Sequence, residues 1–225
     1  MSMEQIQKDF DRIAVLSERE SEPRGTYDPF LQQFIPSPCY RALEVGCGTG
    51  TFTRVLARRA NHVTATDLSG EMIRVARHLS TGYPNIDYSV GDVLEMELPA
   101  SQFDCIVMIA TLHHLPTEPV LEKLKQALTL DGVLILHDLL TPTGVLGTAA
   151  DLVRVPASMA MRCLRTGRLW AKREVRRAWA EHGTEERYLT KQEVAVMRDQ
   201  YLQGGYVKHH LLWRYTLVWY KQDAA

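Results

Sequence analysis

The segment that most constrains the fold is residues 42–52, where a short apolar stretch runs into three alternate glycines and then into a helix-like stretch. Glycine is required where the backbone turns with positive φ or where a ligand lies against the main chain. A dinucleotide-binding G-x-G-x-x-G loop starting at Gly46 would need glycine in place of Thr51, and a P-loop would need a Lys-Ser/Thr ending that the segment lacks. The segment therefore predicts a strand, a tight turn and a helix, either as a plain connection or as the seat of a nucleotide-like cofactor.

Short β-rich runs and helix-like segments alternate from residue 42 onward. The predicted strands are Ala42–Val45, Val63–Thr66, Ile86–Val90, Cys105–Ile109 and Val133–Leu136, and the predicted helices are Phe52–Ala60, Glu71–Leu79 and Val120–Leu128. This alternation is typical of βαβ units and a parallel sheet, and right-handed crossovers place helices on both faces. Two later strands are predicted over Tyr206–Leu212 and Trp213–Tyr220, the second with Trp213, Tyr215, Leu217 and Trp219 on one side.

We therefore predict an α/β fold with a doubly wound, Rossmann-like sheet of seven mostly parallel strands, a terminal antiparallel hairpin and a helical insertion. Residues 1–40 are predicted to form an N-terminal helical cap, whose apolar positions are Ile6, Phe10, Ile13 and Ala14. Residues 41–225 form the main domain. Its insertion covers about residues 141–190, where the alternation stops and helical stretches are predicted over 149–161 and 170–181.

The composition is that of an ordinary globular protein, and it disfavours several classes. The 26 Lys and Arg residues nearly balance 27 Asp and Glu residues, so the net charge of −1 gives no attraction of the whole protein to nucleic acid. No apolar run reaches the length of about 18 residues that a transmembrane helix needs, and residues 1–20 lack the apolar core of a secretory signal. The cysteines at 39, 47, 105 and 163 have no metal-ligand spacing, which indicates reduced thiols and a cytoplasmic protein.

Two aspartates end the predicted strands that follow the glycine loop. Asp67 ends the second strand, about 20 residues after the loop, where a carboxylate can accept hydrogen bonds from ribose hydroxyls. Asp92 ends the third strand at the same carboxyl edge, where open α/β sheets bind ligands. Each aspartate alone is equally well explained as a helix cap or a turn residue. Their joint placement beside the glycine loop favours a nucleotide-like cofactor.

Further segments, in a characteristic order and spacing, make the chain similar to a known family. They are Glu44–Gly50, Asp67–Ser69 with Met72, Gly91–Val93, Phe103-Asp104 with Ala110–Leu115, and Leu130–Leu134. Together they resemble the class I S-adenosylmethionine-dependent methyltransferases over nearly the whole chain. Phe10–Ala14 also matches the Phe-Asp-Arg-Ile-Ala opening of quinone-biosynthesis methyltransferases, within a broad group that acts on small molecules. The resemblance implies S-adenosylmethionine as the cofactor and methyl transfer, of EC 2.1.1 type, as the activity.

The resemblance also implies roles for the residues of the cofactor site. Gly46 and Gly48 would flank the methionyl part of the cofactor, and Glu44 would order the loop and the methionyl amino group. Asp67 would hold the ribose hydroxyls, and Asp92 would hold the adenine amino group. Because S-adenosylmethionine carries no phosphate, the glycines would serve close approach of the main chain rather than anion binding.

The apolar part of the implied cofactor site comes from the same matching segments. Leu68 and Val93 would sandwich the adenine ring. Met72 belongs to the match with the family's ribose and adenine segment, and Ala110 to the match with its fourth strand and exit. Tyr27 would close over the methionyl end, or would simply pack under the N-terminal segment.

Histidines supply the candidates for proton transfer, because imidazole titrates near neutral pH. His113 and His114 leave the fourth predicted strand near the expected methyl group, either to act as general base or to bond the backbone there. His137, which leaves the fifth strand, is a second candidate, whereas His209 and His210 are assigned to structure. No pair of these histidines has i, i+4 spacing and no third ligand is evident, so no metal site is predicted.

The methyl acceptor is less constrained than the cofactor. The Asn/Asp-Pro-Pro-aromatic motif of DNA-amino methyltransferases is missing after the fourth strand, so methylation of DNA is not expected. The insertion carries arginines and apolar side chains that suit a lid over an aromatic, anionic or amphiphilic molecule, namely Leu152, Val155, Met159, Leu164, Leu169, Trp170 and Trp179. Alternatively it is a solvated helical face packed on the domain, or, less favoured, a basic amphipathic surface that contacts membranes.

The predicted function is S-adenosylmethionine-dependent methyl transfer to oxygen or carbon of a hydrophobic or aromatic small molecule. Methylation of a protein or an RNA is one alternative, although a chain of 225 residues leaves little room for an added recognition domain. A catalytically inactive, cofactor-binding partner or regulatory subunit is another alternative, because the cofactor residues only bind. The acceptor and the oligomeric state stay open.

Overall fold

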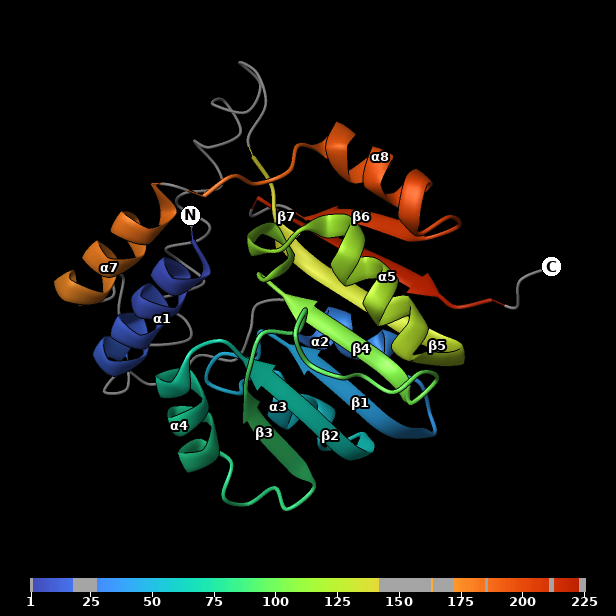
Figure 1. Cartoon of the computed structure of the whole chain (residues 1–225), viewed down its shortest axis with the longest axis horizontal. Coiled ribbons are helices and arrows are strands. Elements are labelled where there is room, and N and C mark those ends of the chain that lie inside the picture. Colours follow the sequence, from blue (N-terminus) through green and yellow to red (C-terminus); the bar gives the residue numbers. More distant parts are fainter. Residues whose placement is uncertain are drawn as a thin grey trace.

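The computed structural model describes residues 2–17, 28–141, 163, 172–184, 186–210 and 213–222. Its strands are β1 (Cys39–Val45), β2 (Ala60–Asp67), β3 (Ile86–Val90), β4 (Phe103–Ile109), β5 (Leu128–Leu139), β6 (Tyr206–His210) and β7 (Arg214–Tyr220). They form one seven-stranded sheet in the order β3-β2-β1-β4-β5-β7-β6 (Figure 1). β1 to β5 pair in parallel, and β7 is antiparallel to both neighbours. This topology confirms the predicted mostly parallel sheet with a terminal antiparallel hairpin.

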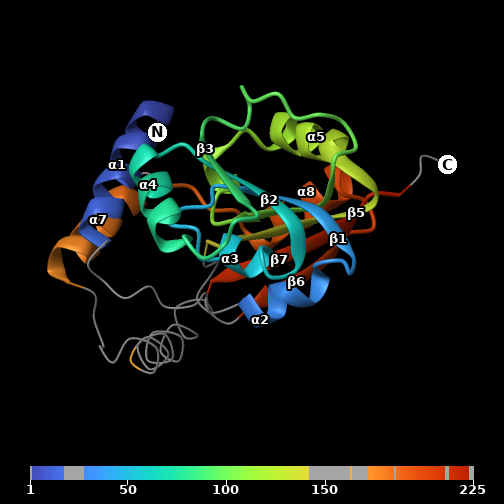
Figure 2. The ribbon, with the colours of Figure 1, turned by 90° about the horizontal axis from the view of Figure 1, so that it is seen from below.

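Helices cover both faces of the sheet, as the predicted crossovers require. The helices are α1 (Met3–Ser17), α2 (Asp28–Leu31), η1 (Gln32–Phe34), α3 (Thr53–Leu56), α4 (Gly70–Leu79), η2 (Leu112–His114), α5 (Thr117–Ala127), α7 (Arg173–Gly183) and α8 (Lys191–Tyr201). Figure 2 shows α5 and α2 on opposite sides of the sheet. Among the helices of the described residues, none has the length and apolar character needed to cross a membrane.

The central strands alternate their side chains between two apolar cores. On one face Leu43, Ile106 and Leu134 pack with α5, whose Leu121 and Leu124 have no exposed surface. The spacing of Val120, Leu121 and Leu124 places these residues on one stripe of α5. A sheet buried on both faces needs nearly continuous apolar strands, which explains why the strand positions were readable in the sequence.

The second core lies on the opposite face of the sheet. Ala42, Cys105 and Ile135 pack there with Leu31 of α2 and Leu56 of α3. The four cysteines of the chain are free thiols, and all but Cys163 are buried.

The N-terminal helix α1 packs against α4 and α7 at one end of the sheet (Figures 1 and 2). Asp11 holds it there, because its Oδ1 accepts hydrogen bonds from the Ser69 hydroxyl at 2.5 Å and from the Glu71 N–H at 3.1 Å. Arg12 pairs with Glu181 of α7 at 2.7 Å. α1 is therefore fixed at the N-terminus of α4, next to the carboxyl ends of the strands.

Two local predictions are corrected by the structure. The helix predicted over Phe52–Ala60 ends early, because the Asn85 side chain donates to the carbonyls of Ala57 and Ala60 at 2.8 and 3.0 Å and Ala60 begins β2. In β7 the predicted one-sided alternation is wrong. Residues 215–218 are all buried, because β7 lies between two strands and has an apolar layer on each face.

The region after β5 holds further differences. α8 was not predicted, although Thr190 and Glu193 form a capping box at its start. The helical stretch predicted over 170–181 appears as α7 from Arg173, and the stretch predicted over 149–161 lies outside the described residues. Residues 211 and 212, predicted to end the first strand of the hairpin, also lie outside them.

Candidate active site

A cavity of about 840 Å³ lies where the carboxyl ends of β1, β2, β3 and β4 meet. These ends share one edge because the strands are parallel. The wall is formed by the segments that follow the strands, together with side chains of α1, α4 and α7. Phe10 and Ile13 of α1 and Val175 and Trp179 of α7 make part of this wall apolar.

The glycine loop gives the cavity a wall of bare main chain. Gly46 has φ +70°, its N–H donates to Thr66 O at 2.8 Å, and a Cβ there would stand 2.1 Å from Thr111 Oγ1. Gly48 has φ +52°, and no atom lies within 4 Å of the place where its Cβ would stand. Since Gly48 lines the cavity, a ligand can approach its backbone directly.

The two strand-end aspartates line the same cavity. Asp67 accepts hydrogen bonds from the N–H groups of Gly48 at 2.8 Å and Ser69 at 2.9 Å. Burial raises the pKa of the Asp67 carboxyl, and these two N–H groups partly offset that effect. Asp92 accepts one backbone hydrogen bond, from Leu94 N–H at 2.9 Å. Both carboxyls keep free lone pairs for a ligand.

Glu44 is the most buried acid of the site, with 2% of its surface exposed. The Thr53 hydroxyl donates to Glu44 Oε2 at 2.5 Å. The pKa of Glu44 is raised to about 8, chiefly by burial and also by the nearby charge of Asp28. The hydrogen bond from Thr53 acts in the opposite direction and lowers it. At neutral pH the carboxyl is therefore mostly protonated in this fold.

The predicted cofactor residues come together here. Glu44, Gly46, Gly48, Asp67, Leu68, Met72, Asp92, Val93 and Ala110 all line the cavity. Tyr27 lies outside the described residues. Sequence reasoning missed Thr111, whose side chain occupies the space that a Cβ at residue 46 would need.

The three candidate histidines occupy different environments. Among them His114 lines the cavity, and burial followed by the charge of His113 lowers its pKa to about 4. His137 is a buried residue of β5, and its Nδ1 lies 2.8 Å from Oγ1 of Thr216 in β7. Burial lowers the pKa of His137 to about 2. His137 is absent from the cavity wall. Because neighbouring residues of a strand face opposite sides, Asp138 rather than His137 faces η2.

His113 lies behind the cavity wall between two carboxyl groups. Its Nδ1 is 2.7 Å from Asp138 Oδ1, and its backbone N–H donates to Asp138 Oδ2 at 3.1 Å. Its Nε2 is 3.4 Å from Glu186 Oε1. Burial lowers the pKa of His113, but the bonds to Asp138 and Glu186 outweigh it and raise the pKa to about 9. His113 therefore carries a positive charge at neutral pH in this arrangement.

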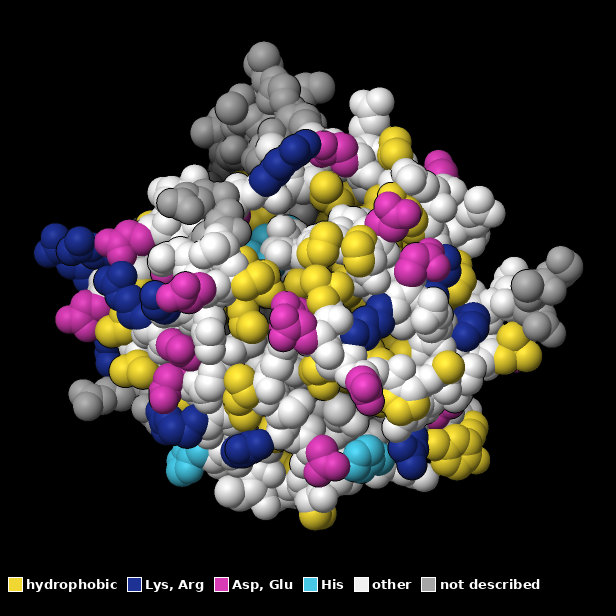
Figure 3. Space-filling view, in the orientation of Figure 1, with side chains coloured by type: hydrophobic (Ala, Val, Ile, Leu, Met, Phe, Trp, Pro, Cys, Tyr) yellow, Lys and Arg dark blue, Asp and Glu magenta, His cyan; other side chains and the backbone are white. Residues whose placement is uncertain are grey.

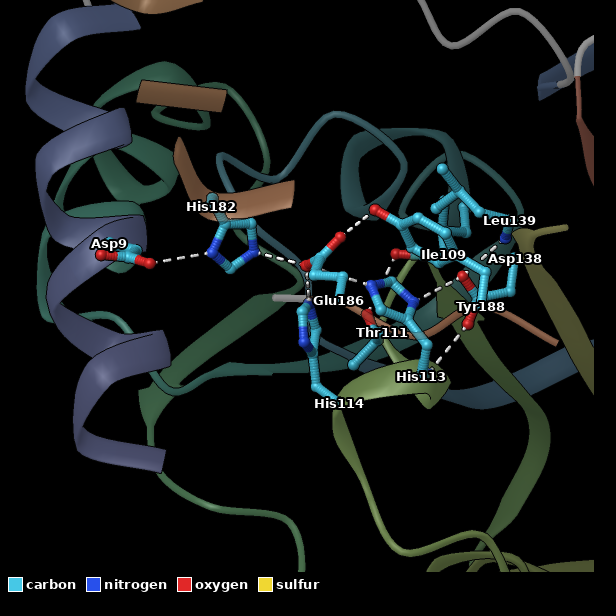
Figure 4. Close-up of polar contacts among 10 residues, drawn as sticks. All are labelled: Asp9, Ile109, Thr111, His113, His114, Asp138, Leu139, His182, Glu186 and Tyr188. Carbon is cyan, nitrogen blue, oxygen red and sulfur yellow. Dashed lines mark hydrogen bonds and ion pairs between the residues drawn. The ribbon is translucent and has the colours of Figure 1, made fainter. Parts of the chain in front are cut away.

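Glu186 is the centre of a cluster that the sequence did not reveal (Figure 4). Its Oε1 lies 3.4 Å from His113 Nε2, 3.3 Å from His114 Nε2 and 2.6 Å from His182 Nε2. Tyr188 donates its hydroxyl to Oε2. Burial raises the pKa of Glu186. The bonds from His113 and Tyr188 together have a larger, opposite effect and lower the pKa to about 2. No short-range spacing connects Glu186 with residues 113 and 114, so no sequence signal marked it.

Comparisons with known proteins point to methyltransferases. Residues 43–136 match the methyltransferase domain family. An uncharacterized methyltransferase of Mycobacterium bovis is 35% identical over 118 residues, which cover 52% of this chain and 59% of that protein. A ubiquinone biosynthesis O-methyltransferase of Xylella fastidiosa is 33% identical over 124 residues, which cover 49% of this chain and 50% of that protein. The chain thus spans between half and three fifths of the length of these curated relatives.

Solved structures share the fold. Phosphoethanolamine N-methyltransferase 2 of Haemonchus contortus, in complex with phosphomonomethylethanolamine and S-adenosylhomocysteine, has a TM-score of 0.69 and 14% identity, over 99% of this chain and 61% of that chain. The sequence match over residues 43–136 and the shared fold make this chain similar to class I S-adenosylmethionine-dependent methyltransferase domains. The predicted fold class is thereby confirmed, and the sequence matches agree with the predicted family.

The residues of the cavity fit this cofactor. Gly48 offers bare backbone for close approach, and the carboxyl groups of Glu44, Asp67 and Asp92 line the same cavity. Acceptor oxygens suit a ligand with hydroxyl groups, amino groups and a net positive charge.

Proposed function

We propose that this chain transfers a methyl group from S-adenosylmethionine to oxygen or carbon of a hydrophobic or aromatic small molecule. The observation that carries the proposal is a single cavity that joins the acidic strand ends to an apolar wall made by α1 and α7. A cavity walled by helices on this side suits a small acceptor better than a side chain of a protein or a nucleotide of RNA.

The acidic side of the cavity is proposed to bind the cofactor. Asp67 uses two of its lone pairs on Gly48 and Ser69 and keeps others for ribose hydroxyls. Asp92 uses one on Leu94 and keeps others for the adenine amino group. When bound, S-adenosylmethionine supplies an electrophilic methyl group on a positively charged sulfur.

Glu44 is proposed to order the glycine loop and to face the methionyl amino group. The positive charge of that group favours the ionised form of Glu44, which the ligand-free fold disfavours. Leu68 and Val93 are proposed to enclose the adenine ring, and both line the cavity. The apolar contacts supply shape, and the carboxyls supply orientation.

The apolar side of the cavity is proposed to bind the acceptor. Phe10, Leu115 and Trp179 line it and would exclude water from the reacting atoms, which helps methyl transfer chiefly through alignment. His114 is the candidate histidine on this wall, so we assign the polar contact with the acceptor to His114 rather than to His113 or His137.

Charges on the described surface do not favour nucleic acid as the acceptor. Figure 3 shows acidic and basic side chains interspersed on the face it displays. In the insertion, Arg177 pairs with Glu181 at 2.6 Å and Arg187 pairs with Glu193 at 2.8 Å. Paired arginines leave less positive potential for a phosphate backbone or a membrane.

The proposal is tested by binding and turnover. Asp67→Ala is expected to weaken S-adenosylhomocysteine binding roughly 10- to 150-fold, which corresponds to about 1.5–3 kcal/mol for hydrogen bonds to a charged group. Asp87→Ala, an exposed aspartate on β3, is the matched control and should bind as the wild type does. Because Asp67 also bonds Gly48 and Ser69, Asp92→Asn provides a second variant, and thermal unfolding checks each fold.

Turnover separates the proposed enzyme from the alternatives. The wild type is incubated with S-adenosylmethionine and a panel of aromatic and hydroxylated small molecules, and formation of S-adenosylhomocysteine is measured. Product with the panel supports the proposal. Product only with a protein or RNA fraction, or tight cofactor binding without product in every fraction, would contradict the small-molecule assignment.

A further inference from the structure

The cluster around Glu186 contains a set of metal-ligand types in close reach of one another. We propose that His113, His114 and Glu186 bind a first-row divalent cation such as Zn²⁺ at the wall of the cavity. One ligand atom from each residue lies within 4.8 Å of the other two. Two imidazoles and one carboxylate are a ligand set that catalytic zinc sites use.

The distances in the cluster suit an ion between the ligands. His113 Nε2 and His114 Nε2 lie 3.4 and 3.3 Å from Glu186 Oε1. These separations are longer than the usual N–H···O range of about 2.7–3.2 Å. Two ligand atoms bound to one tetrahedral Zn²⁺ at about 2.0–2.1 Å stand about 3.4 Å apart. The spacing in the ligand-free fold therefore also suits two ligand atoms around one ion.

The surrounding residues orient the ligands as in metal centres. Asp138 Oδ1 lies 2.7 Å from His113 Nδ1, which leaves Nε2 directed at Glu186 (Figure 4). A carboxylate on the second imidazole nitrogen is the usual support of a metal-bound histidine. Tyr188 donates its hydroxyl to Glu186 Oε2. His182 Nε2 lies 2.6 Å from Glu186 Oε1, and His182 Nδ1 lies 3.0 Å from Asp9 Oδ2. Side chains of α1, α7 and β5 thus fix the ligands from outside.

The site borders the acceptor side of the cavity, because His114 lines it. Three protein ligands leave a fourth position, which catalytic zinc sites give to water or substrate. That position would take an oxygen of the acceptor, and this last step rests on the proposed function. Binding of the metal itself does not depend on that function.

The test uses the full chain, stripped of metal with a chelator and studied without cofactor. We expect Co²⁺ to bind with 1:1 stoichiometry and to give the intense visible absorption of tetrahedral Co²⁺, and Zn²⁺ to displace it. Glu186→Gln and His114→Gln should each weaken Co²⁺ binding at least tenfold. Glu174→Gln, an exposed glutamate in the first turn of α7, is the matched control and should stay within twofold.

A second measurement needs no variant. In NMR spectra of the wild type, Zn²⁺ should shift the imidazole signals of His113 and His114 and leave the exposed His78 unchanged. Failure to bind one equivalent of Co²⁺ or Zn²⁺ at concentrations up to about 1 mM, unchanged affinity in a folded Glu186→Gln variant, or shifts confined to surface histidines would overturn the site. S-adenosylhomocysteine affinity of Glu186→Gln should stay within twofold, which separates failure of the metal site from failure of the cofactor site.

Discussion

Glu44→Gln is the perturbation with the clearest expected magnitude, because it removes a carboxyl that the ligand-free fold keeps protonated. Burial raises the pKa of Glu44 to about 8 from an ordinary value of 4.5. Each pKa unit corresponds to about 1.4 kcal/mol, so the full difference amounts to about 5 kcal/mol. Since the folded-state pKa is the higher one, this stability is fully present below pH 4.5 and is lost as the pH rises through 8.

The assay is urea unfolding of the ligand-free protein at several pH values. Between pH 5 and 9 the ionisation of Glu44 should lower the free energy of unfolding of the wild type by about 4 kcal/mol. Glu44→Gln has no group to ionise there and should not show this decrease. The free energy of unfolding of the variant minus that of the wild type should therefore rise with pH. Thr53→Val, which removes the hydroxyl that holds the pKa of Glu44 down, should move the wild-type midpoint upward.

Ligand binding gives the opposite pH dependence. If the methionyl amino group favours ionised Glu44, binding of S-adenosylhomocysteine releases a proton below pH 8, and wild-type affinity should fall by up to tenfold per pH unit as the pH decreases. Glu44→Gln should bind weakly at every pH. Parallel unfolding curves for wild type and variant, with a difference that stays constant within about 1 kcal/mol, would refute the assigned protonation of Glu44.

Two further predictions concern backbone and helix contacts. Gly46→Ala should destabilise the fold by at least about 2 kcal/mol in urea unfolding, because its Cβ would stand 2.1 Å from Thr111 Oγ1 at φ +70°. Gly82→Ala is the control, since no atom lies within 4 Å of the Cβ position there. Equal losses of stability in the two variants would contradict this explanation. Asp11→Ala should cost about 1 kcal/mol and speed amide exchange in α1, because the α4 N-terminus loses its two hydrogen bonds to α1. Unchanged exchange would mean that apolar packing alone holds α1.

The sheet and the cofactor side of the site were predictable because local sequence encodes them. The strand Ile86–Val90 has the predicted bounds, Asp67 ends β2 as expected, and Asp92 follows the end of β3 by two residues. Parallel strands bring their carboxyl ends together whatever lies between them, so each strand-end residue could be placed from its own neighbourhood. The positive φ of Gly46 follows from the same local reasoning.

The acceptor side was less predictable because its contacts join distant segments. Glu186 follows α7 yet meets His114, which follows β4. Only the packing of α1 and α7 at the strand ends brings these residues together. The one-sided pattern predicted for residues 213–219 failed for a related reason, since the apolar layer on the second face of β7 comes from elsewhere in the chain. α8 is a different case, because its start carries a local signal, the capping box of Thr190 and Glu193.

The position of β7 between β5 and β6 has a consequence for how the chain folds. β6 is synthesised before β7, yet in the described sheet β7 is its neighbour and β5 is not. β6 therefore cannot join the sheet until β7 is available to pair with it. Because hairpin strands meet within microseconds whereas distant strands must first close a long loop, we expect β6 and β7 to pair with each other before β7 docks on β5. Closure of the loop between β5 and the hairpin is then expected to be a late step of sheet assembly.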